Sequence, residues 1–107
     1  MIREVINSQG ARVDFENFVL CVGKGWHSIL YKLYDDLVKL GWDLQLSQVK
    51  EKFGTLRFYI GYGSDEMFSV IDKTEHKTST TCEECGRPGR INNDNKYWIR
   101  TLCDECR

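Results

Sequence analysis

Residues 82–106 read CEECGRPGRINNDNKYWIRTLCDEC, and this stretch decides the C-terminal fold of the chain. It contains two C-x2-C pairs, separated by a gap of 17 residues. The spacing is typical of a tetrahedral four-thiolate zinc site, because two residues between thiols let one tight turn direct both sulfurs at one metal. We therefore predict one structural Zn²⁺ ion. Its ligands are Cys82, Cys85, Cys103 and Cys106.

The gap between the pairs fits a β-hairpin that brings the second pair back to the first. Residues 89–91 and 96–101 are strand-like, and the polar run 92–95 separates them. Gly86 follows the first pair, where a residue without a Cβ can adopt the left-handed conformation that closes a thiolate turn. Two disulfides, or a redox-active C-x2-C pair, remain as alternatives to zinc.

Composition indicates a globular domain. The chain has 107 residues, of which 41% are hydrophobic and 29% are charged. Its N-terminus has no hydrophobic signal core, and no stretch is long and apolar enough to span a membrane. We therefore expect a cytoplasmic protein with reduced thiols and no membrane partner. The fifth cysteine, Cys21, lies among apolar residues and is expected to be buried.

Upstream of the cysteines, the segment from residue 26 to residue 40 has the periodicity of an amphipathic helix. Its apolar residues recur at spacings of three and four, which gives one stripe that we expect to face the core. Gly41 follows, where a helix C-cap commonly lies. The stripe consists of Trp26, Ile29, Leu30, Leu33, Tyr34, Leu37 and Leu40.

Residues 42–52 and 55–61 are predicted to form an antiparallel hairpin around a turn at Phe53-Gly54. Alternation along the second strand places Leu56, Phe58 and Ile60 on one face. Arg57 and Tyr59 lie on the other face. We expect the helix to pack against the apolar face of this hairpin.

A second helix is predicted from an N-cap at Ser64 to about His76. Residues 77–81 are the only linker-like stretch, which predicts an α+β body over residues 1–79 and a zinc-binding hairpin over residues 80–107 that packs on it. The apolar residues that we expect the second helix to bury are Met67, Phe68, Val70 and Ile71.

Three stretches together resemble a family of small, largely uncharacterised proteins that bacteriophages and bacterial genomes carry. They are Gly25-Trp26, the run QVKEKFGTLRFY at 48–59, and the cysteine segment with Trp98 and the run TLCD at 101–104. The resemblance spans roughly residues 23–106. It implies an α+β body with a C-terminal zinc-binding hairpin, and it implies no reaction.

We find no set of residues typical of an enzyme active site. Neither His27 nor His76 begins the H-x-E signature of zinc deaminases. The run Gly61-Tyr62-Gly63-Ser64 lacks the lysine of a Walker loop. Four thiolates would also leave no open metal position for a catalytic water. We therefore predict that the protein is not an enzyme.

Two basic surfaces are candidates for partner binding. The first, on the predicted hairpin, suits an acidic partner or a nucleic-acid backbone, although it also fits a solvated sheet face. It consists of Lys50, Lys52, Arg57 and Tyr59. The second interleaves cations with an aromatic ring in the zinc hairpin, which suits stacking on bases. It consists of Arg90, Trp98 and Arg100.

The formal net charge is −1, and a zinc ion on four thiolates makes it more negative. This balance disfavours generic nucleic-acid binding, which depends on lysine and arginine. We predict a zinc-stabilised protein-interaction module, encoded by a phage, that binds or inhibits a host protein such as a CRISPR–Cas defence complex. A zinc-ribbon nucleic-acid binder is the alternative, and an enzyme of unknown reaction is less favoured.

Overall fold

The computed structural model describes residues 2–92 and 99–107 and confirms an α+β fold with a C-terminal cluster of four cysteines. The molecule is elongated, with extents of 39 × 26 × 24 Å. Its elements are β1 (Glu4–Ile6), β2 (Arg12–Asp14), α1 (Glu16–Val19), the 3₁₀ helix η1 (Lys24–Trp26), α2 (His27–Lys39), β3 (Leu46–Lys52), β4 (Thr55–Ile60), α3 (Asp65–Thr78), β5 (Arg90–Asn92) and β6 (Arg100–Leu102).

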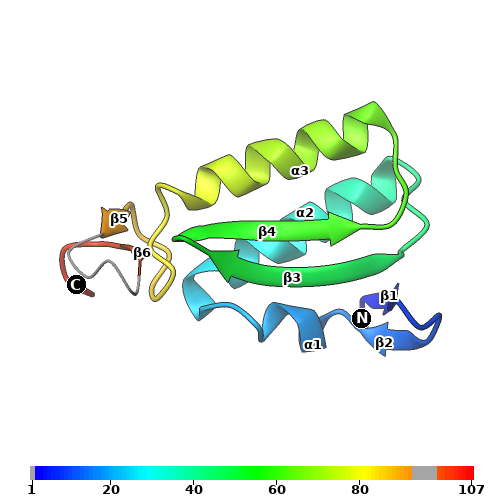
Figure 1. Ribbon diagram of the computed structural model, residues 1–107, viewed down its shortest axis with the longest axis horizontal. Coiled ribbons are helices and arrows are strands. Elements are labelled where there is room, and N and C mark those ends of the chain that lie inside the picture. The colour runs from blue at the N-terminus through cyan, green and yellow to red at the C-terminus, as the bar shows by residue number, and fades with distance from the viewer. Residues whose placement is uncertain (1, 93–98) are drawn as a thin grey trace.

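The β3–β4 hairpin and helix α2 form the centre of the molecule. The strands pair antiparallel, with Val49 opposite Phe58. These residues and Leu56 belong to the same buried core as Leu30 and Leu37 of α2, as the two alternating patterns predicted. Figure 1 shows α2 behind the hairpin, the β1–β2 hairpin at one end of the molecule, and β5 and β6 at the other.

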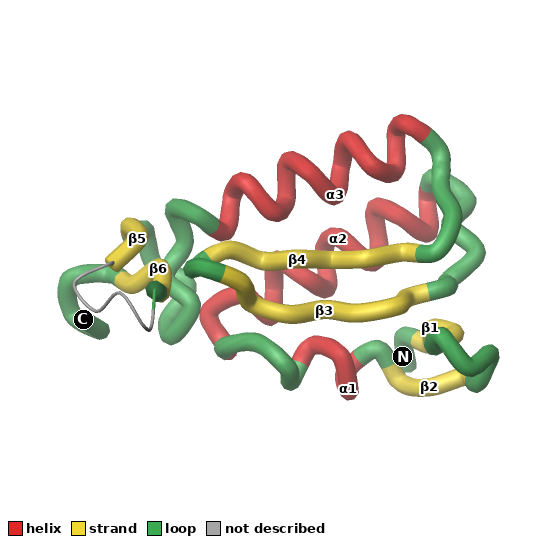
Figure 2. The backbone as a smooth tube through the Cα atoms, in the orientation of Figure 1, coloured by secondary structure: helices red, strands yellow, loops and turns green. Residues whose placement is uncertain are grey.

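Helix α3 lies alongside β4 and also packs against α2 (Figure 2). Two of its side chains bind backbone amides of β4. The N–H of Leu56 donates to Oγ1 of Thr78 at 3.0 Å, and the N–H of Phe58 donates to the carboxylate of Glu75 at 2.8 Å. These bonds fix the C-terminal half of α3 against the strand.

Both predicted helix caps are confirmed. The N–H of Met67 donates to Oγ of Ser64 at 3.2 Å, which caps the start of α3. Gly41 follows the C-cap Leu40 of α2 and has φ +92°. This left-handed conformation is the one that glycine adopts without steric cost at a helix end.

Three residues expected in the core are exposed instead. Leu40 is 36% exposed because α2 ends at residue 39, so the stripe does not reach it. Phe68 is 47% exposed. It is turned by about 100° from its neighbour Met67, which occupies the buried face of α3. Cys21 lies in the turn after α1, and its thiol donates to the carbonyl of Asn17 at 3.5 Å.

The stretch expected to be a linker is ordered structure. Helix α3 continues to Thr78. The side chain of Thr78 is fully buried, and its hydroxyl accepts a hydrogen bond from the N–H of Leu56 in β4. Thr81 then forms an isolated antiparallel bridge with Pro88. The polar composition of residues 77–81 therefore reflects hydrogen bonding to the backbone rather than flexibility.

Replacing Leu33 by alanine is expected to lower the free energy of unfolding by about 2–5 kcal/mol, because the side chain is fully enclosed by the core. Urea titration of the purified protein measures the loss. Leu40→Ala, at the more exposed end of the same stripe, is the matched control and should cost clearly less than Leu33→Ala, because Leu40 is 36% exposed. Equal effects for the two variants would contradict the placement of the stripe.

Candidate metal centre

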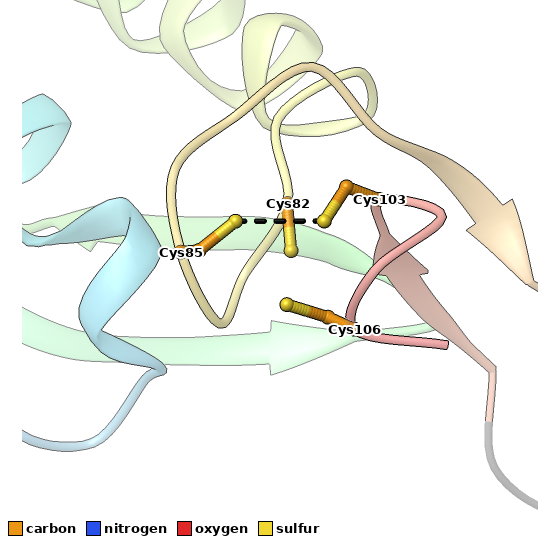
Figure 3. Close-up of side chains that lie close together, drawn as sticks. All are labelled: Cys82, Cys85, Cys103 and Cys106. Atoms are coloured by element: carbon orange, nitrogen blue, oxygen red, sulfur yellow. Dashed lines mark hydrogen bonds between the residues drawn. The ribbon is translucent and has the colours of Figure 1, made fainter.

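The sulfur atoms of the four paired cysteines converge at the C-terminal end of the molecule. All four Sγ atoms lie within 4.8 Å of one another. The Sγ atoms of Cys85 and Cys103 are 3.5 Å apart, and the four side chains point toward a common centre (Figure 3). A metal with four sulfur ligands at about 2.3 Å places those sulfurs about 3.8 Å apart in a tetrahedron. The cluster can therefore hold one metal ion.

Each cysteine pair lies on a tight backbone turn. In the first, the N–H of Gly86 donates to the carbonyl of Cys82 at 2.9 Å, and Gly86 has φ +84°, the left-handed conformation that the sequence predicted. In the second, the N–H of Cys106 donates to the carbonyl of Cys103 at 3.2 Å. Strand β6 enters the second turn and pairs antiparallel with β5, which confirms the predicted pairing of the two strands. Asn92, expected in the turn, belongs to β5 instead, and residues 93–98 lie outside the described part of the chain.

The close approach of the four thiols shifts their pKa values in opposite directions. The neighbouring thiol of Cys103, together with burial, raises the pKa of Cys106 to about 12. At Cys82, burial acts to raise the pKa, but hydrogen bonds from the backbone of Cys103 and Cys85 outweigh it and lower the pKa to about 6. A divalent cation relieves the repulsion among thiolates, so metal binding displaces the remaining protons.

The first cysteine turn is bonded to the loop that precedes α2. The N–H of Gly25 donates to the carbonyl of Glu83 at 2.7 Å, and the N–H of Gly23 donates to the Glu83 carboxylate at 3.0 Å. The indole N–H of Trp26 donates to the carbonyl of Thr81 at 2.8 Å. Residues some sixty positions apart in the chain therefore build one unit.

Gly25 makes the closest approach in this unit. A Cβ built on it would lie 2.1 Å from the carbonyl oxygen of Cys82 and 2.6 Å from the backbone nitrogen of Gly86. Because both neighbours are backbone atoms, no side-chain movement relieves the overlap. Only glycine at this position allows the loop and the cysteine turn to touch.

The β3–β4 turn forms the second contact of the cysteine module. Oγ1 of Thr101, a fully buried residue of β6, donates to the carbonyl of Gly54 at 2.5 Å. The N–H of Glu83 donates to the carbonyl of Thr101 at 3.0 Å, which links this contact to the first cysteine turn. The cysteine module is thus held at two places on the body.

Arg100, which the sequence suggested as a partner contact, is bound within the molecule. Its side chain is 19% exposed and forms ion pairs with Glu83 and Glu84. Arg90 is exposed, but its guanidinium lies 3.5 Å from the carboxylate of Asp104. Trp98 lies outside the described residues. The structure therefore does not leave Arg90 and Arg100 as an open basic surface, because both are paired with carboxylates.

The predicted hairpin surface is formed as expected. We call Lys50, Lys52, Arg57 and Tyr59 the cationic face. Lys50 lies directly opposite Arg57, and Lys52 and Tyr59 lie two residues further along their strands, so all four side chains share the face that points away from α2. Nζ of Lys50 lies 5.9 Å from the centre of the Tyr59 ring.

The histidines take no part in the metal centre. Nε2 of His27 lies 3.0 Å from the carbonyl oxygen of Val22, and His76 is exposed on α3. In the described part of the chain, the only group of histidine, cysteine or acidic residues arranged to hold a metal is the four-cysteine cluster. Nor does any helix in that part combine the length and apolarity needed to cross a bilayer.

No protein-family model matches the chain, and comparisons with curated proteins and with solved structures found no significant match. The resemblance to small phage and bacterial proteins therefore stays a prediction.

Proposed function

We propose that the four-cysteine cluster binds one Zn²⁺ ion and that the metal has a structural role. The observation that carries this proposal is the convergence of four Sγ atoms within 4.8 Å. Soft thiolates in a tetrahedral arrangement favour zinc or iron over hard cations, and four protein ligands leave no position for a substrate or an activated water.

We further propose that the protein is a non-enzymatic interaction module whose partner is a host protein. We also propose that a phage encodes it and that it inhibits a host defence complex. Two observations support this proposal. The cysteine module is hydrogen-bonded to the body, and the cationic face makes no ion pair with any of the described residues. A zinc-ribbon nucleic-acid binder is the second candidate. The exposed Arg87 and Arg90 favour it, but their ion pairs with Glu105 and Asp104 weaken it.

Elemental analysis of protein purified without chelator tests the metal proposal. We expect about one zinc per chain, as for a single four-thiolate site. Cys82→Ser removes a buried ligand and should lower the zinc content sharply. Cys21→Ser removes the exposed cysteine outside the cluster and is the matched control, which should keep its zinc.

Two results would contradict the metal proposal. The first is protein without metal whose four cysteines form disulfides by mass spectrometry. The second is stoichiometric iron with its visible absorption, which would make the centre a redox-active site rather than a structural one.

A further inference from the structure

Two cations face each other across the β3–β4 hairpin. Lys50 and Arg57 are directly opposite in the register, and Lys52 adds a third positive charge to the same face. Like charges at directly opposite positions of an antiparallel pair destabilise the sheet. Folding alone therefore does not account for this arrangement, because an acidic residue at position 50 would replace the repulsion by an attraction to Arg57.

Elsewhere in the molecule, carboxylates balance the positive charges of the arginines. Each arginine other than Arg57 has a carboxylate within 4.0 Å. Over residues 2–92 and 99–107, no such ion pair reaches Lys50, Lys52 or Arg57. Lys50 and Lys52 lie instead beside the rings of Tyr59 and Phe53. Burial raises the pKa of the Glu75 carboxyl, and the charge of Arg57 opposes this rise over a longer distance. The two lysines therefore carry the positive charge that no carboxylate of the described residues balances within 4.0 Å, in a protein whose net charge is −1.

A hollow of about 580 Å³ lies beside this face, between β4 and α3. Its apolar wall includes Tyr59 and Phe68, two rings that are 41% and 47% exposed. Its rim on α3 carries Asp72 and Glu75. The hollow therefore suits an uncharged apolar side chain, whereas a ligand's carboxylates are repelled from it and attracted to the lysines.

We propose that the cationic face and this hollow together bind an acidic segment of a partner protein that carries an apolar or aromatic residue beside its carboxylates. The carboxylates pair with Lys50, Lys52 and Arg57, and the apolar side chain enters the hollow next to Tyr59. This inference rests on the proposed function as an interaction module, and it names the surface and the chemistry of the partner.

The same features disfavour a nucleic acid as the occupant. Affinity for a phosphate backbone grows with the number of phosphates that lysine and arginine neutralise. The face offers three such residues, and the acidic rim of α3 borders it along β4. A short acidic segment needs only two or three carboxylates to bind, and this number matches the three cations of the cationic face.

Selection of peptides from a random display library on the zinc-loaded chain tests the proposal. We expect the enriched peptides to combine aspartate or glutamate with an adjacent aromatic or large aliphatic residue. Binding of a selected peptide, measured by fluorescence anisotropy, should weaken by at least about tenfold in the Lys50→Glu, Lys52→Glu double variant. Phe68→Ala should weaken it too, because it removes one wall of the hollow.

The matched control is the Lys39→Glu, Lys77→Glu double variant, which makes the same change in net charge at exposed positions of α2 and α3. It should retain peptide affinity. The thermal midpoint and the zinc content of every variant are measured alongside. The midpoint of the Lys50→Glu, Lys52→Glu variant should not fall, because Lys50→Glu replaces repulsion with Arg57 by attraction.

Several outcomes would overturn the proposal, and they separate it from the proposed function. Selected peptides without acidic residues, or peptides that bind the Lys50→Glu, Lys52→Glu variant equally well, would leave an interaction module with a different surface. Failure to enrich any peptide would also overturn it. Binding of a single-stranded oligonucleotide that Arg87→Glu with Arg90→Glu abolishes would overturn the proposed function itself in favour of the zinc-ribbon candidate.

Discussion

Removing the metal should unfold the cysteine module and loosen the start of α2. Among residues 80–92 and 99–107, the module's own buried apolar cluster consists of Cys82, Leu102 and Cys103, with Cys106 packed against it. So small a core does not offset the conformational entropy of ordering the chain. Zinc binding to comparable sites supplies about 10–16 kcal/mol at neutral pH, and this binding energy acts as folding energy.

Chelator titration followed by NMR measures this effect. Amide resonances of residues 80–92 and 99–107 should collapse toward random-coil positions, and those of Gly23 and Gly25 should shift, because their N–H groups donate to Glu83. Resonances of β1 and β2, at the far end of the molecule, serve as the internal control. Unchanged spectra after complete zinc removal would show that the module folds without metal.

The same titration should depend on pH. With the pKa of Cys106 raised to about 12, this thiol holds its proton in the metal-free protein at neutral pH, and zinc must displace it. Acidification therefore favours the metal-free state.

Trp26→Ala should lower the free energy of unfolding by about 3–5 kcal/mol, because the ring is fully buried and its loss leaves a large cavity. The side chain also donates to the carbonyl of Thr81, so the variant removes a bond between body and module. Trp26→Phe is the matched comparison, since it keeps an aromatic ring and removes the N–H. Urea titration of zinc-saturated protein checks both.

The two variants should separate packing from attachment. Trp26→Phe leaves the half-buried carbonyl of Thr81 without this donor, which should lower stability by less than the loss of the whole indole ring. Its zinc affinity should fall as well, because Thr81 immediately precedes the first ligand. A Trp26→Ala variant that is as stable as the parent would show that the indole is not part of the core.

Local patterns in the sequence were sufficient for much of the fold and for the metal centre. The C-x2-C spacing places both sulfurs of a pair on one turn, so the cluster depends on few residues outside it. The stripe of α2, the alternation in β4 and the cap at Ser64 are also short-range signals, and the structure confirms them. Apolarity alone predicts Phe68 in the core, but Met67 and Ile71 occupy the buried face of α3 and Phe68 is 47% exposed.

The contact between body and module was not predictable in the same way. Gly25 and Cys82 are far apart in the chain but in contact in the fold. A single sequence does not show which loop packs against which turn. One signal was nevertheless present. Gly23 and Gly25 flank a single lysine, which indicates close approach of a backbone.

The bonds from α3 to β4 also determine how the molecule can meet others. A strand that joined β4 from outside would need the amides of Leu56 and Phe58, and both already donate to Thr78 and Glu75. Addition of a strand from a second copy is therefore blocked along this edge, which removes one common route to fibres and mispaired dimers. A partner that approaches β4 must be recognised by side chains rather than by continuation of the sheet.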